Sequence, residues 1–226
     1  MFRKILLFLL LASNFSCIFN TENDKDFGAF RSDFIQNYAH LFPDEVPLSK
    51  GSPQPSELHI PDATTMDSVK VFYDKFSSEM QDFKVNELPE NEKKDLNKIS
   101  NMTKSVNSYL IGYQDNPYVF NVLIPFKRIL NSSFDTPENR LQILFNKLEK
   151  VPLFYEAAKS QVSKATVPQA DETIERHFET YHFFDITLPD YIKTHHHLTP
   201  QYEERLEDAK LAIKDYIAYV ESLRLK

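Results

Sequence analysis

Three adjacent histidines are the residues of this chain whose type and spacing most readily suggest metal chemistry. Neighbouring imidazoles in a loop can bind zinc or copper, and a nearby carboxylate can complete such a site. The candidate ligands are His195, His196 and His197, with Asp190 or Glu203 as the carboxylate. A histidine run without a supporting cysteine is typical of a solvated segment before a helix. We therefore predict no metal site and keep the three histidines as the candidates for the alternative.

Of the four histidines that precede this run, the two nearest to it do not have the spacing of a helical zinc motif. Such a motif places two histidines four residues apart with a glutamate after the first, and the sequence contains no His-Glu dipeptide. His177 and His182 are five residues apart, which turns them about 140° around a helix axis, so they cannot both bind one ion on a helix. Acidic residues surround them, and we interpret these as a solvated face rather than an acid–base pair. They are Glu172, Glu175, Glu179 and Asp185.

The sequence offers no recognisable nucleophile. It has neither a Gly-x-Ser-x-Gly elbow nor a Ser-x-x-Lys set, and its three glycines do not form a phosphate-binding loop. We predict no catalytic residue and no cofactor.

The amino terminus predicts export. Arg3 and Lys4 precede an apolar run from Ile5 to Ala12, which is the length of a signal peptide core and too short to span a bilayer. Small Ser16 then precedes Cys17, the one cysteine of the chain, as in lipoprotein signals whose cysteine carries the acyl chains. We expect a signal peptide over residues 1–16, lipidation at Cys17, a polar tether over residues 17–25 and a helical domain over residues 26–226. The alternative is a simple signal peptide in which Cys17 is incidental.

This reading predicts an acidic protein of the cell envelope, anchored to the outer membrane by its lipid. The formal net charge of −7 becomes −9 when the two cations of the signal are removed. Such a chain is a poor binder of nucleic acid, so we expect no nucleic-acid partner. No later stretch approaches the length of a membrane span.

The remaining pattern predicts an all-α fold, a single irregular bundle of about six or seven helices with corners marked by proline. Apolar residues recur at helical spacing over residues 26–41, 64–83, 89–112, 136–158, 169–184 and 200–223. Thr136-Pro137 and Thr199-Pro200 each combine a helix N-cap with a proline in the first turn. We expect Gly112 to cap a helix, Pro125 to kink the apolar segment around it or to confine it to short turns, and Pro189 to break the segment that follows residue 184.

An ordered set of segments resembles the bacterial domain of unknown function 885 family. It comprises Asp115–Tyr118, Asn139–Lys159, Thr173–Glu175, Leu188-Pro189 and Tyr202–Leu223. Full members of that family look like helical zinc metallopeptidases or related hydrolases, often lipoproteins, with a His-Glu-x-x-His helix in their carboxy-terminal half. The sequence ends at Lys226, before that half, so the resemblance carries no metal ligand to any residue here and implies zinc only if a missing half completes the site.

The resulting hypothesis is a lipid-anchored, non-catalytic helical module. It is either a truncated family member with a binding or scaffolding role or one half of a split hydrolase completed by a protein partner. The alternative is a metal-dependent hydrolase or peptidase with an unrecognised site around the histidine run. Under the first hypothesis we expect an exposed apolar patch, contributed by residues 118–130 and 182–192.

Overall fold

The computed structural model describes residues 26–43, 45, 57–113, 116–132, 135–195 and 199–224, and these residues form helices and no strand. The predicted signal peptide, Cys17 and the whole of the predicted tether, residues 17–25, lie outside the described residues. The α-helices, in chain order, are α1 (Phe27–Leu41), α2 (Ala63–Glu79), α3 (Glu90–Tyr113), α4 (Leu123–Leu130), α5 (Pro137–Gln161), α6 (Val167–His182), α7 (Leu188–His195) and α8 (Pro200–Leu223). The shorter elements are the 3-10 turns η1 (Met80–Asp82), η2 (Val85–Glu87) and η3 (Pro117–Val119) and the π-helical turn η4 (Phe183–Thr187). Since η4 joins α6 to α7 without a break, the described residues make seven helical rods, and the predicted all-α fold is confirmed.

Side-chain caps begin the helices where the sequence indicates. Thr136 accepts a hydrogen bond from the Asn139 amide at 3.3 Å, and Thr199 accepts one from the Tyr202 amide at 3.4 Å. In both helices a proline fills the first turn, where its missing N–H leaves no bond unmade. Thr166 opens α6 with a full capping box. The predicted Thr-Pro starts are therefore confirmed.

Expectations about helix breakers are corrected in part. Gly112 does not cap a helix but lies inside the last turn of α3. Pro125 does not kink α4, because it is the third residue of that helix and the first four N–H groups of a helix need no intrahelical acceptor. The segment around it is short, as the alternative expected, and consists of the turn η3 and the eight-residue α4. Pro189 does not break the chain direction, since the π-helical turn η4 precedes it and the Leu188 amide donates to the Phe183 carbonyl five residues earlier. This wider turn relieves the clash of a proline ring with the carbonyl four residues before it.

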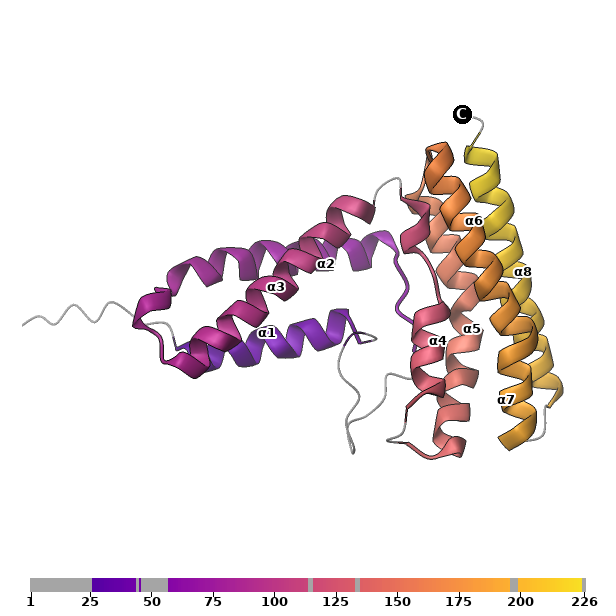
Figure 1. The fold of residues 1–226 in the computed structure, drawn as a ribbon, viewed down its shortest axis with the longest axis horizontal. Helices are drawn as coiled ribbons and strands as arrows, with labels where there is room; N and C mark the ends of the chain where they lie inside the picture. Colours follow the sequence, from indigo (N-terminus) through magenta and orange to yellow (C-terminus); the bar gives the residue numbers. More distant parts are fainter. Residues whose placement is uncertain are drawn as a thin grey trace, which may run out of the picture.

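The helices pack around two hydrophobic cores (Figure 1). The arm, residues 26–43 and 63–113, comprises α1, α2 and α3, and its core is rich in phenylalanine, including Phe34 and Phe76. The bundle, residues 116–132, 135–195 and 199–224, comprises α4 to α8, and its core is larger and more aliphatic. Figure 1 shows the arm extending sideways from the long axis of the bundle.

The arm and the bundle meet at an elbow. Leu58, just before α2, and Met66, in its first turns, belong to the core of the bundle, while Tyr109 and Leu110 of α3 pack against both cores. The buried Lys147 of α5 donates to the Glu57 carbonyl at 2.9 Å, which ties the segment before α2 to the bundle. Side-chain packing and this hydrogen bond from a lysine side chain to a backbone carbonyl thus join the two helical groups.

The apolar segments expected to remain exposed instead pack largely against each other. Phe126 of α4 and Phe184 of η4 are fully buried, with ring centroids 4.8 Å apart. Leu188 and Ile192 are also fully buried, and Ile124 is the large apolar side chain of the first segment that is most exposed, at 72%. The described residues of these two segments leave Ile124 and Ile186, the latter at 47%, as exposed large apolar side chains, and the second segment packs on α5 and α8. The expectation of an extensive apolar patch is therefore wrong.

Candidate functional site

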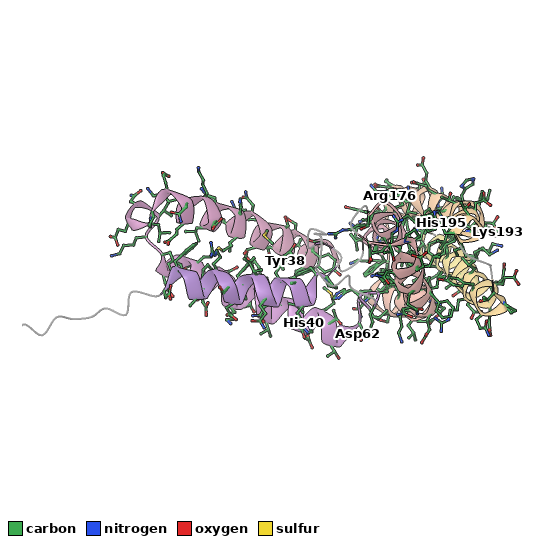
Figure 2. All side chains as sticks on the ribbon, turned by 90° about the horizontal axis from the view of Figure 1, so that it is seen from below. Tyr38, His40, Asp62, Arg176, Lys193 and His195 are labelled. Atoms are coloured by element: carbon green, nitrogen blue, oxygen red, sulfur yellow. The ribbon has the colours of Figure 1, made fainter. Side chains whose placement is uncertain are left out.

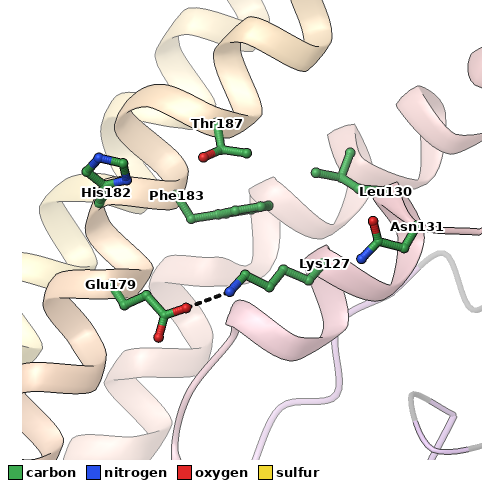
Figure 3. Close-up of a pocket in the computed structure, with 7 residues that line it drawn as sticks. All are labelled: Lys127, Leu130, Asn131, Glu179, His182, Phe183 and Thr187. Carbon is green, nitrogen blue, oxygen red and sulfur yellow. Dashed lines mark hydrogen bonds and ion pairs between the residues drawn. The ribbon is translucent and has the colours of Figure 1, made fainter.

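A groove between α4 and the α6–η4 junction brings several polar side chains together (Figure 3). Its volume is about 280 Å³. It is lined by Lys127, Leu130, Asn131, Glu179, His182, Phe183 and Thr187. Glu179 and His182, two residues named from the sequence, lie on one wall of this groove. The sequence did not predict that Lys127 and Leu130 of α4 would form the opposite wall.

An ion pair crosses this groove. Lys127 Nζ of α4 lies 2.6 Å from Glu179 Oε1 of α6, and both side chains are about half exposed. An exposed pair of this kind contributes little to stability, typically below about 1 kcal/mol, so its main effect is on local shape and charge. Thr187 reaches the groove from the π-helical turn, an element found often at functional sites. The groups present can donate and accept hydrogen bonds to a polar ligand or to a partner surface.

His177 lies away from the groove, fully buried in the bundle. Its Nδ1 lies 2.7 Å from the Thr173 carbonyl oxygen and its Nε2 lies 2.9 Å from the Phe120 carbonyl oxygen. The ring packs between Tyr155 and Tyr216, at centroid distances of 5.6 and 5.0 Å. Burial lowers the pKa of His177, against the two carbonyl contacts, which raise it. The Phe120 contact joins α6 to the segment between η3 and α4, which is a structural role.

The histidine run is only partly described. His195 is exposed at the end of α7 (Figure 2), where its Nδ1 lies 2.9 Å from the Tyr191 carbonyl and its ring stacks on Tyr191 at 4.3 Å. His196 and His197 lie outside the described residues. In the described part of the chain, no group of three or more histidine, cysteine or acidic side chains converges as a metal site.

The acidic series forms ion pairs on the surface. Glu172 pairs with Arg176 at 2.6 Å, and Asp185 of η4 pairs with Lys210 of α8 at 3.0 Å. Together with the pairing of Glu179 across the groove, these contacts match the interpretation of a solvated face. None of the helices within the described ranges combines the length and the apolar character needed to cross a membrane.

Comparison with known proteins gives one informative likeness, in structure. The chain matches no protein-family model and no curated protein. Its fold is similar to the structure of a candidate lipoprotein of unknown function from Shewanella oneidensis, with a TM-score of 0.70 and 22% identity. The match covers 87% of this chain and 37% of the other, so this chain spans well under half the length of its structural neighbour. At this identity the likeness shows a shared fold.

Proposed function

We propose that this chain is a lipid-anchored helical module of the bacterial cell envelope that acts through binding rather than through a catalytic site of its own. The observation that carries the proposal is the order of the amino-terminal residues, in which a short apolar run ends at Ser16 and Cys17. Two or more acyl chains on this cysteine would provide a stable anchor, since each CH₂ group buried in the bilayer contributes about 0.8 kcal/mol to membrane binding. The fold shared with a candidate lipoprotein supports the same assignment.

The proposed anchor is tested by removing its attachment atom. In a bacterial host with a lipoprotein pathway, the full-length wild-type chain is expected to sediment with outer membranes and to resist extraction by salt. Cys17→Ser should release most of the protein into the periplasmic fraction, because serine provides no thiol for acylation. Ser16→Ala is the matched control, since it keeps a small residue before the cysteine and should stay in the membrane. Equal sedimentation of the wild type and the serine variant would contradict the proposal.

The proposed binding role concerns a second protein. The resemblance to domain of unknown function 885 proteins, whose full members look like zinc-dependent hydrolases, favours a partner that supplies a catalytic half. The groove in Figure 3, with its exposed Lys127–Glu179 pair, offers hydrogen-bonding groups for such a contact. A neighbouring reading frame that encodes a His-Glu-x-x-His helix should then yield a protein that co-purifies with this chain and gains zinc-dependent hydrolase activity from it. An inactive, non-associating neighbour would favour a stand-alone scaffolding lipoprotein.

A further inference from the structure

A second cavity lies at the elbow, away from the groove of Figure 3, and its lining differs in chemistry. Its volume is about 140 Å³, the equivalent of about four to five water molecules at roughly 30 Å³ each. Aromatic side chains from three elements face it: Phe42 at the end of α1, Tyr109 of α3 and Phe154 of α5. Phe42 and Tyr109 meet edge to face, with ring centroids 6.2 Å apart. The arm and the bundle therefore both contribute walls to one aromatic cavity.

The described lining residues of the cavity include one carboxylate and one imidazole, that of His59, and no lysine or arginine. The carboxylate belongs to Glu45, which follows α1 in a turn closed by its own amide on the Phe42 carbonyl at 2.9 Å. Tyr38 donates a hydrogen bond to Glu45 Oε2, which fixes the carboxylate and leaves Oε1 without a hydrogen bond from the described residues. Burial, followed by the charge of Glu45, raises the pKa of Tyr109 to about 12, so this carboxylate acts on a hydroxyl that lines the cavity.

Two side-chain oxygens of the lining already accept hydrogen bonds. Asn121 Oδ1 accepts from the Leu123 amide at 2.8 Å and from Thr180 Oγ1 at 3.0 Å, and Glu45 Oε2 accepts from Tyr38. A primary ammonium has three N–H groups that each need an acceptor. A quaternary ammonium has no N–H group, and aromatic faces within about 6 Å attract it through the ring quadrupole. Aromatic walls with one carboxylate thus suit a methylated cation better than a protonated amine.

From these contacts we infer that the elbow cavity is a binding site for a small, soluble quaternary ammonium ion. Phe42, Tyr109 and Phe154 provide the aromatic faces, and Glu45 provides the compensating charge. Because the walls come from both helical groups, a bound ion would also hold the arm against the bundle. The inference does not depend on lipidation or on a hydrolase partner.

Choline chloride is the probe that tests this site, titrated calorimetrically into the detergent-solubilised full-length chain. Saturable binding at one site per chain is expected. The uncharged isostere 3,3-dimethylbutan-1-ol should bind at least about tenfold more weakly, which corresponds to about 1.4 kcal/mol. Glu45→Gln should weaken choline binding by a similar factor, whereas Glu57→Gln, an exposed carboxylate outside the lining, should leave it unchanged. Circular dichroism of each variant confirms that the helices remain folded.

Several results would overturn the inference. These are the absence of saturable choline binding to the folded wild type, equal binding of the isostere, and unchanged binding in folded Glu45→Gln. Binding to phosphatidylcholine vesicles without binding of free choline would also overturn it, because it would assign recognition to a membrane surface instead of this cavity. Phe154→Leu gives an independent check from the bundle side, since loss of one aromatic face should weaken choline binding more than binding of the isostere.

Discussion

The arm and the bundle are both helical, yet they bury different kinds of side chain. The buried residues of the arm are aromatic and aliphatic apart from Thr103, whose hydroxyl bonds to the Ile99 carbonyl of its own helix. The bundle buries His177 and Lys147 completely, and both reach backbone carbonyls outside their own helices. Burial of rings holds the arm together, whereas the bundle adds polar contacts that fix how its helices lie against each other.

Tyrosine hydroxyls supply several of the polar contacts in the bundle. Tyr202 of α8 donates to the Leu141 carbonyl of α5, and Tyr216 of α8 donates to the Pro117 carbonyl at 2.9 Å. Arg205 also donates to a carbonyl of α5, that of Phe145, at 2.7 Å. Buried polar groups need such partners, so each contact disfavours alternative helix positions that would leave a group unpaired. The bundle is therefore the part in which polar contacts fix the positions of the helices. The arm should tolerate the replacement of one apolar side chain by another more readily.

The largest expected effect is the loss of a ring from the core of the arm. Phe76 is fully buried and packs against Phe34 and Phe72 at centroid distances of 5.1 and 4.7 Å. Phe76→Ala should lower the free energy of unfolding by about 3–5 kcal/mol, because it removes buried surface and leaves a cavity. Urea unfolding followed by circular dichroism measures this change. Val71→Ala on the same helix, at a side chain 67% exposed, should change it by less than about 0.5 kcal/mol.

A smaller effect should separate two neighbouring tyrosines of the bundle. Tyr155 and Tyr216 have ring centroids 5.0 Å apart and are both fully buried, but only the Tyr216 hydroxyl makes a hydrogen bond. The Val122 backbone lies near the Tyr155 hydroxyl without a bond of ordinary length and angle. Tyr216→Phe should therefore cost about 0.5–1.5 kcal/mol, since the Pro117 carbonyl loses one of its two donors and keeps the Phe120 amide at 3.4 Å.

Tyr155→Phe should be neutral or stabilising, because it removes a buried hydroxyl that has no partner. Both variants are compared by urea unfolding under the same conditions. Equal destabilisation by the two substitutions would show that the Tyr216 hydrogen bond is not what distinguishes this position.

The smallest effect is a change in how stability depends on pH. Burial lowers the pKa of His177 below its ordinary value of 6.5, so the unfolded chain binds the proton more readily than the folded chain. This contribution to stability is present above pH 6.5 and is lost as the pH falls from there toward the lowered pKa. His177→Gln should flatten that decline in urea midpoints measured from pH 7.5 to pH 5. His182→Gln, at an exposed histidine of the same helix, serves as the control and should keep the wild-type slope.

The sequence predicts where helices begin more directly than it predicts which face of a helix is buried. Thr136-Pro137 and Thr199-Pro200 predict the starts of two helices, because N-capping and the fixed φ angle of proline depend only on neighbouring residues. The buried face of α6 could not be predicted from apolar periodicity, because its buried residues are small or polar. They are Ala170, Thr173, His177 and Thr180.

The elbow and the groove depend on contacts between distant segments, which local patterns do not contain. Lys147 shares a helical face with Leu144 and Val151, so its spacing did signal burial, but nothing in the sequence identified the Glu57 carbonyl as its partner. The π-helical turn before Pro189 keeps α6 and α7 continuous, and α7 then buries Leu188 and Ile192 in the core of the bundle. A local reading of proline favoured a break at that place.

The anchor is the central claim, and the mass of the mature amino terminus tests it most directly. Full-length protein is purified from membranes of a lipoprotein-competent bacterial host and analysed by intact and peptide mass spectrometry. We predict a chain that begins at Cys17 and carries the added mass of a diacylglyceryl group, with or without a further acyl chain. An unmodified amino terminus, at Cys17 or at any other residue, would contradict it.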